Sequence, residues 1–154
     1  KHEQDRADDD ADDIAAGRHC VAARSEFGDL LVGARGDAGA RSGIAVKGGT
    51  ILIGGSTGYM TGFMMQKGRL VVCGDAGAAF GDSMYQGELF CGGDIADLGS
   101  DTLVEEPTDE ELAWLADTCR PFGLGPKSGW RKVRAEGKLW RYDKKEFAAW
   151  REAL

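Results

Sequence analysis

Apolar residues recur at intervals of about 19 residues between positions 27 and 100 of this chain. Apolar runs occupy positions 30–32, 51–53, 70–72 and 89–91, and a glycine lies two positions before each run. Short apolar runs bounded by turn residues are typical of β-strands. A glycine every few residues excludes a stable helix in this region.

The glycines follow the same period as the apolar runs. Self-similarity at a period near 20 residues is the signature of a solenoid, in which each repeat forms one coil and buries its apolar face against its neighbours. Since an extended chain advances about 3.3 Å per residue, one coil would be roughly 60 Å around and would enclose only side chains. We therefore expect a mainly β fold, a single-stranded β-helix with a short α/β arm after it. The clearest glycine column consists of Gly36, Gly55, Gly74 and Gly93.

The alternation within each run predicts which side chains point into the coils. We expect three ladders of stacked apolar side chains in the interior. The first ladder consists of Leu30, Ile51, Leu70 and Leu89. The second ladder consists of Val32, Ile53, Val72 and Cys91. The third ladder consists of Val46, Met65 and Met84.

The central residue of each run should point outward, which places an apolar row on the outside of the coils. Monomeric proteins rarely expose a continuous row of this kind. Either a terminal arm of the chain itself covers the row, or a partner subunit does. The row, which we treat as a candidate partner interface, consists of Leu31, Leu52, Val71 and Phe90.

The repeat decays after Gly93, and a helix is predicted further on. Thr108 lies three residues before Glu111, which is the spacing of an N-cap residue and its capping-box partner. Pro107 precedes the cap, as expected at a helix start. The buried face of this helix should contain Leu112, Leu115 and Trp114.

The remaining residues predict a hairpin and a final helix. The hairpin should span residues 130–143 and turn near Glu136-Gly137, and Asp143 should cap a helix that faces inward through Phe147 and Trp150. We therefore divide the chain into an acidic N-terminal arm, the β-helix and a C-terminal docking arm, at residues 1–26, 27–100 and 101–154. Further candidate partner contacts in the docking arm are Trp130, Trp140 and Trp150.

Composition and charge exclude several functions. The 154 residues carry a formal net charge of −7 and a pI near 4.8, which argues against nucleic acid as a partner because phosphates would be repelled. No apolar run approaches the roughly 18 residues of a membrane-spanning helix, so we expect a cytoplasmic protein without a membrane partner. The acidic run at residues 5–13 is expected to be a solvated lead-in, with a cation site as the alternative.

The sequence offers no clear catalytic or metal-binding constellation. The two histidines, His2 and His19, lie in the N-terminal arm, and the four cysteines form no C-x-x-C pair. Recurrent aspartates at the coil corners are explained by turn capping, although they could also be ligands. These aspartates are Asp37, Asp75 and Asp94. We therefore expect no catalytic residue, no metal and no bound cofactor on this chain.

The repeated segment "GGTILIGGSTGYMTGFMMQKGRLVVCGDAGAAFGDSMYQGELFCGGD" (residues 48–94) resembles the GXGXG domain, the right-handed single-stranded β-helix at the C-terminus of the glutamate synthase large subunit. The similarity covers about residues 27–100. The following segment, "IADLGSDTLVEEPTDEELAWLADTCRPFGL" (residues 95–124), is most similar to the small stand-alone subunit of N-methylglutamate synthase.

The resemblance implies a role in an enzyme complex of three kinds of chain. Its partners would be a glutaminase-like amidotransferase subunit and a glutamate-synthase-like subunit that binds FMN and an iron–sulfur cluster. The complex would convert glutamate and methylamine to N-methylglutamate and ammonia. The β-helix itself would bind no cofactor and carry no catalytic residue, and it would hold the two active-site subunits apart.

Two other hypotheses remain open at this point. The same β-helix occurs as the solenoid subunit of formylmethanofuran dehydrogenase, a molybdenum or tungsten complex, but there the solenoid usually continues without a helical arm. Alternatively, the chain could be an independent enzyme or binding module that uses Asp37, Asp75 and Asp94 as ligands.

Overall fold

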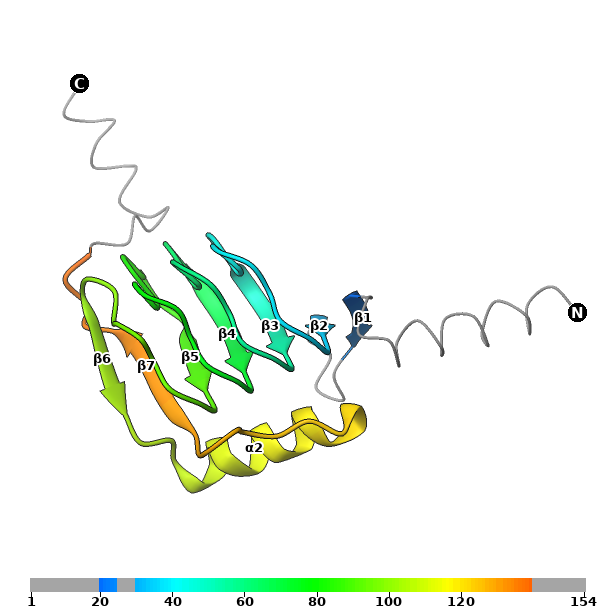
Figure 1. Cartoon of the computed structure of the whole chain (residues 1–154). Helices are drawn as coiled ribbons and strands as arrows, with labels where there is room; N and C mark the ends of the chain where they lie inside the picture. The colour runs from blue at the N-terminus through cyan, green and yellow to red at the C-terminus, as the bar shows by residue number, and fades with distance from the viewer. Residues whose placement is uncertain (1–19, 25–29, 140–154) are drawn as a thin grey trace, which may run out of the picture.

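The structure, a computed structural model, describes residues 20–24 and 30–139 of the chain. The described strands form one sheet with the order β1-β2-β3-β4-β5-β7-β6. Figure 1 shows the strands stacked side by side, with the single α-helix of the described residues running across them.

The central strands confirm the predicted solenoid, which has about three turns. Strands β2 (Leu30–Ala34), β3 (Lys47–Ile53), β4 (Lys67–Val72) and β5 (Glu88–Cys91) pair in parallel, each with the next. The connecting segments also stack, because isolated parallel bridges join one coil to the next outside the strands. Each of the four predicted apolar runs therefore forms a strand.

The register of the first coil differs from the prediction. Val32, and not Leu30, is paired with Ile51. The first two runs begin 21 residues apart instead of 19, and backbone pairing compensates for the two additional residues by shifting β2 along β3. Leu30 is consequently 57% exposed and does not belong to the interior ladder. The later coils keep the predicted register, since Ile51 pairs with Leu70 and Leu70 pairs with Leu89.

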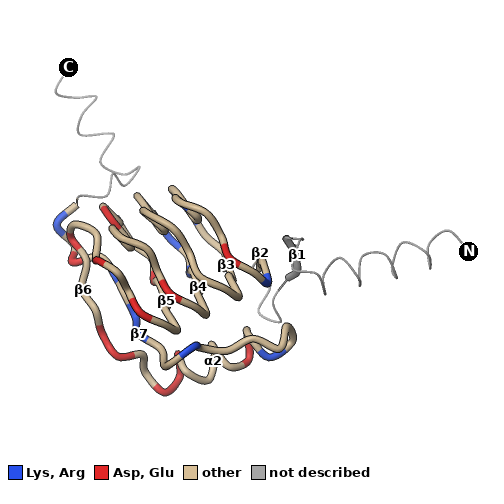
Figure 2. Tube along the Cα trace, viewed as in Figure 1, with Lys and Arg blue, Asp and Glu red and all other residues tan. Residues whose placement is uncertain are grey.

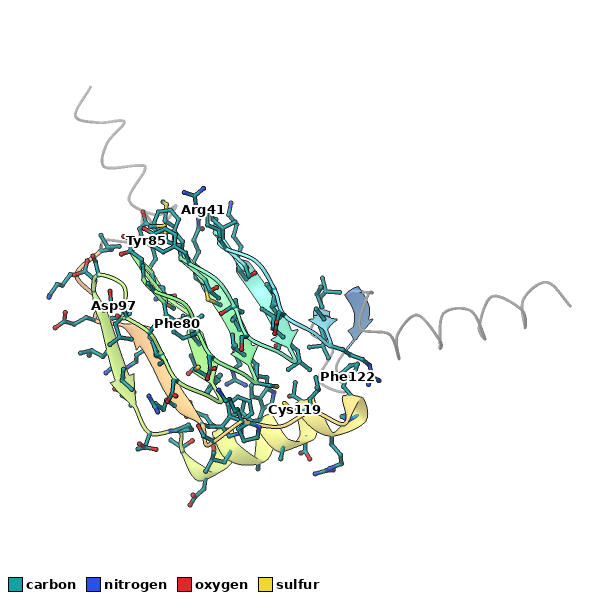
Figure 3. All side chains as sticks on the ribbon, viewed as in Figure 1. Arg41, Phe80, Tyr85, Asp97, Cys119 and Phe122 are labelled. Carbon is teal, nitrogen blue, oxygen red and sulfur yellow. The ribbon has the colours of Figure 1, made fainter. Side chains whose placement is uncertain are left out.

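The interior of the coils is an apolar core that largely matches the predicted ladders. Val46 and Ile51 lie at its margin and are only partly buried. The sequence did not predict the contributions of Val133 and of Phe80, which is labelled in Figure 3 and is fully buried in this core. The buried members are Ile53, Met65, Leu70, Val72, Ala76, Phe80, Met84, Leu89, Cys91 and Val133.

Antiparallel strands cover the two ends of the solenoid. Strand β1 (Cys20–Arg24) pairs with β2, and β7 (Arg131–Ala135) pairs with β5. A further strand, β6 (Thr102–Glu105), pairs with β7 and forms the sheet edge. Open edges of stacked coils expose unpaired backbone groups, so these additions limit end-to-end association.

The predicted hairpin is correct only in its first strand. Strand β7 occurs where expected, but its partners are β5 and β6 and not the segment that follows it. Residues 136–139 contain no strand, and the remainder of the second strand and the final helix lie outside the described residues. Strands β1 and β6 were not predicted, because neither has a glycine-bounded apolar run.

Helix α2 (Asp109–Cys119) begins as predicted. The Glu111 backbone N–H donates to the Thr108 side chain, and the Glu111 carboxylate accepts from the Thr108 backbone N–H, which completes the capping box. Leu115 is buried and Trp114 is half-buried, but Leu112 is 40% exposed, so its predicted burial is wrong. A short 3₁₀ helix, η1 (Arg120–Phe122), continues α2 and ends at Gly123.

Two positions show why the glycine columns are needed. Gly68 has a φ of +106°, and a Cβ there would lie 2.6 Å from the carbonyl oxygen of Gly49 in the neighbouring coil. At Gly93, a Cβ would lie 2.3 Å from Oδ1 of Asp75. The coils approach each other too closely at these corners for any side chain.

Candidate functional site

The outer apolar row is buried by the chain's own helix α2. Leu52, Val71 and Phe90 are at most 1% exposed, and they form one cluster with Leu115 and Cys119 of the helix. Figure 3 shows Cys119 and Phe122 on this side of the strands. The structure therefore shows the first of the two alternatives, in which a terminal arm of the chain itself covers the row.

The prediction of a partner interface at this row is corrected accordingly. Leu31, Leu52, Val71 and Phe90 are buried within the chain, each at most 7% exposed, so the row does not form an open apolar surface. An amphipathic helix tethered to the solenoid removes the same apolar area from water as a partner subunit would. Trp130 packs against the same cluster and is partly buried. Trp140 and Trp150 lie outside the described residues.

A group of charged side chains fastens α2 to the sheet beside this cluster. The Lys132 ammonium of β7 pairs with Glu88 of β5 at 2.7 Å and with Glu111 of α2. Glu88 also accepts from the Arg69 guanidinium at 2.8 Å. Figure 2 shows these basic and acidic segments of β7, β5 and α2 beside one another. The side chains of Lys132 and Glu111 are both only 12% exposed, so this charge is neutralised locally.

The pKa values in this group reflect that pairing. Burial alone would raise the pKa of Glu111, but hydrogen bonds from Lys132 and from the Thr108 backbone outweigh it and lower the pKa. Burial would likewise lower the pKa of Lys132, yet hydrogen bonds to Glu111 and Glu88 raise it. Both residues are therefore charged at neutral pH and act as a structural fastening.

The recurrent corner aspartates form a hydrogen-bonded ladder between coils. The Ser56 backbone N–H donates to Oδ1 of Asp37 at 2.7 Å, and the Asp75 backbone N–H donates to Oγ of Ser56 at 3.0 Å. One coil further, the Asp94 backbone N–H donates to Oδ1 of Asp75 at 2.9 Å. These contacts support turn capping as the role of the column.

Two carboxylates of this column, those of Asp75 and Asp94, are paired with cations from the C-terminal part of the chain. Lys127 pairs with Oδ2 of Asp75 at 2.6 Å, and this hydrogen bond lowers the pKa of Asp75. Arg131 lies 3.4 Å from Oδ1 of Asp94. Asp75 and Asp94 thus bind cationic side chains of their own chain, and within the described residues the column forms no group that could hold a metal ion.

A long open groove lies on the part of the outer face that α2 does not cover. Its volume is about 1390 Å³. The floor consists of the N-terminal parts of β3, β4 and β5, where a glycine directly precedes each of Thr50, Arg69 and Glu88. Trp114 and Phe122 form the wall on the helix side, and the groove reaches the coil corner at Tyr85. Figure 3 shows Tyr85 and Phe122 at opposite sides of the strands.

Cys73, Cys91 and Cys119 are buried free thiols. A hydrogen bond with Cys119 raises the pKa of Cys73, and burial acts in the same direction. Burial also raises the pKa of Cys91. The thiols of Cys73 and Cys91 are therefore protonated at neutral pH and are poor nucleophiles and poor metal ligands. Within residues 30–139, no group of three His, Cys, Asp or Glu side chains is arranged to hold a metal ion.

Comparisons with protein-family models, with curated proteins and with solved structures find no significant match to this chain. In the part of the chain that the structure describes, no helix has the length and apolar character needed to cross a membrane.

Two features that shape this face were not predicted from the sequence. The fastening by Lys132 depends on β7 lying between β5 and β6, and no local pattern indicates that pairing. The groove depends on where α2 crosses the strands. One signal was available, because Lys47 and Lys67 precede glycines at equivalent positions of adjacent coils.

Proposed function

We propose that this chain is a non-catalytic structural subunit of a glutamate-synthase-like amidotransferase complex of the N-methylglutamate synthase type. The observation that carries the proposal is the in-register stacking of coils from Ile51 through Leu70 to Leu89. This architecture is the one that the resemblance of residues 48–94 to the GXGXG domain implies.

In this proposal the chain acts through its shape. Stacked coils with close backbone contact and a continuous apolar core form a stiff body that can keep two larger subunits at a fixed separation. The charged groups of the described residues support such a role, since the corner carboxylates and the fastening group stabilise the fold. The amidotransferase-like and FMN-binding partners would supply the chemistry and the iron–sulfur cluster.

The location of the partner contacts follows from the covered row. Because α2 buries the outer apolar row, subunit contacts in such a complex would use the remaining surface of the coils and the C-terminal residues after 139. A complex would therefore form without displacing α2.

The proposal is tested by capture of the tagged full-length chain from its native cell extract, followed by mass spectrometry and an absorbance spectrum. We expect an amidotransferase-like chain, a glutamate-synthase-like chain and flavin absorbance in near-stoichiometric amounts. Recovery of a molybdenum or tungsten enzyme would instead support the formylmethanofuran dehydrogenase type. Recovery of the chain alone, from cells that contain both expected partners, would contradict the proposal.

Two glycine variants provide matched controls for this capture. Gly39→Ala introduces a Cβ with nothing within 4 Å, so it should retain the partners. Gly68→Ala introduces a Cβ against the neighbouring coil and should lose them with the solenoid. Equal capture by both variants would show that binding is due to the tag or to an unfolded chain.

A further inference from the structure

The groove beside α2 carries positive charge that the described residues do not neutralise. Its three acidic residues are each paired with a cation: Glu88 with Arg69, Asp117 with Arg120 at 2.8 Å, and Glu136 with Lys138 at 2.5 Å. The five basic residues of the groove are Lys47, Lys67, Arg69, Arg120 and Arg134.

Lys47 and Lys67 are the uncompensated members of this set. They form a register pair on the neighbouring strands β3 and β4, and both are exposed. Neither makes an ion pair within residues 30–139. Like charges that lie opposite each other on paired strands repel, so this pair favours an anionic occupant between or beside the two ammonium groups.

The dimensions of the groove indicate a polypeptide rather than a small molecule. Small-molecule sites usually have volumes of about 300–1,000 Å³ and enclose most of their ligand. This groove is larger, open to solvent, and extends across three coils. Its glycine floor, at Gly48, Gly49, Gly68 and Gly87, lets another backbone approach closely.

We propose that the acidic segment at residues 5–13 of the same chain docks in this groove against Lys47 and Lys67. The segment, "DRADDDADD", contains six aspartates and one arginine. The C-terminal segment at residues 140–154 contains four basic and three acidic residues, so its charge is not complementary. This inference is independent of the function proposed above.

The connection through β1 is long enough for this docking. Cys20, where β1 begins, pairs with Ala34, which pairs with Ile53. The distance along the strand from Ile53 back to Lys47 is about 20 Å. Crossing the two strand spacings to β3, or the three to β4, adds about 10–14 Å sideways. The straight distance from Cys20 to either lysine is therefore about 22–25 Å. Asp8 and Cys20 are twelve residue steps apart, a stretch that can extend about 40 Å, so the aspartates reach the lysines without strain.

Tethering makes a weak electrostatic contact effective. A short flexible connection gives the segment an effective concentration on the order of millimolar at the groove. The contact depends on charge at a partly exposed site, so salt should weaken it. While docked, the segment would neutralise the lysine pair and occupy the uncovered half of the outer face.

Zero-length carbodiimide crosslinking of the full-length protein tests the proposal, because it joins carboxylates to lysine amines only in direct contact. At low salt we expect residues 5–13 to be crosslinked to Lys47 and Lys67 at least about fivefold more than to Lys127 or Lys138, and 1 M NaCl should remove this preference. The two reference lysines are more than half exposed, with 58% and 63% of their side chains accessible, and each already has a carboxylate partner in the described residues. A mixture of ¹⁴N- and ¹⁵N-labelled protein shows whether the products lie within one chain.

Three results would overturn the proposal. Crosslinks spread evenly over all four lysines would show that the segment has no preferred site. Products that combine labelled and unlabelled chains would assign the groove to a second copy. Crosslinks from Lys47 and Lys67 to Asp143, Glu146 or Glu152 would assign it to the C-terminal segment.

A variant without the acidic charge provides a second readout that does not depend on reactive lysines. Asp8→Asn, Asp9→Asn and Asp10→Asn together should shift the amide NMR signals of Gly48 and Gly68 toward their high-salt positions. The exposed corner residue Asp97 offers a control, since Asp97→Asn should leave these signals unchanged. Unchanged groove signals in the triple variant would also contradict the docking.

Discussion

The guanidinium of Arg69 lies over the indole ring of Trp114, with its central carbon 4.3 Å from the ring centroid. Arg69 belongs to the sheet and Trp114 to α2, so this cation–π contact joins the solenoid to the helix. The Trp114 ring also packs against Phe90, with the ring centroids 5.8 Å apart. Contacts of these kinds contribute about 0.5–2 kcal/mol each. Together with the Lys132 ion pairs, they hold α2 over the apolar row.

The Lys132 fastening should be a major contribution to stability. We expect Lys132→Met to lower the free energy of unfolding by about 2–4 kcal/mol at pH 7, because it leaves two adjacent carboxylates, Glu88 and Glu111, without their shared cation in a mostly buried site. Urea unfolding followed by circular dichroism measures the change. Lys138→Met removes an exposed lysine and should leave the free energy of unfolding close to the wild-type value. Equal effects of the two variants would show that the fastening is unimportant.

The lowered pKa of Glu111 predicts acid sensitivity. A carboxylate whose folded-state pKa lies below its unfolded value stabilises the fold fully above the unfolded value, near pH 4.3, and this stabilisation is lost as the pH falls through the folded-state pKa. Glu111→Gln keeps a hydrogen-bond acceptor for the capping box but removes the charge. The variant should be less stable than the wild type at pH 7 by about 1–3 kcal/mol. The difference should shrink as the pH falls through the folded-state pKa of Glu111.

At alkaline pH the raised pKa of Lys132 predicts a loss of stability as the pH rises. Lys132 has a raised pKa, so its stabilisation is complete below its unfolded value, near pH 10.4, and is lost as the pH rises through the folded-state value. Urea unfolding from pH 2 to 11 measures both effects. A wild-type advantage over Glu111→Gln that did not change with pH would contradict the assignment of the charge pair.

The buried row predicts a stability effect in the isolated chain. Phe90 is 0% exposed, and Phe90→Ala should lower the free energy of unfolding by about 3–5 kcal/mol. If that variant does not fold, Phe90→Leu should still show a loss of about 1 kcal/mol. Leu30→Ala changes a side chain that is 57% exposed and should cost less than about 0.5 kcal/mol. An unaltered midpoint in the Phe90 variants would mean that α2 does not cover the row in solution.

The close contacts between coils predict that replacing glycine by alanine has a different effect on stability at two positions. Gly68→Ala places a Cβ 2.6 Å from a backbone oxygen at a φ of +106°, so we expect a loss of more than about 2 kcal/mol. Gly39→Ala meets nothing within 4 Å and should change stability by less than about 1 kcal/mol, with a gain from reduced unfolded-state entropy. Thermal melts of the two proteins provide the comparison. A similar melting temperature for both would contradict the close stacking of the coils.

Some of the structure follows directly from local sequence. The capping box at Thr108 and Glu111 forms as its spacing predicts, since all its atoms lie within one helical turn. The apolar runs form strands for the same reason. The predicted position of Leu30 was wrong because it is not set by local sequence. It depends on how the first two coils accommodate two residues beyond the repeat length. Strand β6 has no strong local pattern, and it exists because β7 provides backbone partners.

The sequence by itself determined that this chain forms stacked coils. A period of about 19 residues with glycines at the corners favours stacked coils, because hydrophobic burial and backbone pairing then recur at nearly the same spacing. The tertiary structure decided what covers the outside. Helix α2 could have faced solvent or a partner, and only the meeting of Lys132 with Glu111, and of Trp114 with Arg69 and Phe90, places it over the row. Contacts between residues far apart in the chain have no periodic signature, because they depend on complementary shape and charge in three dimensions.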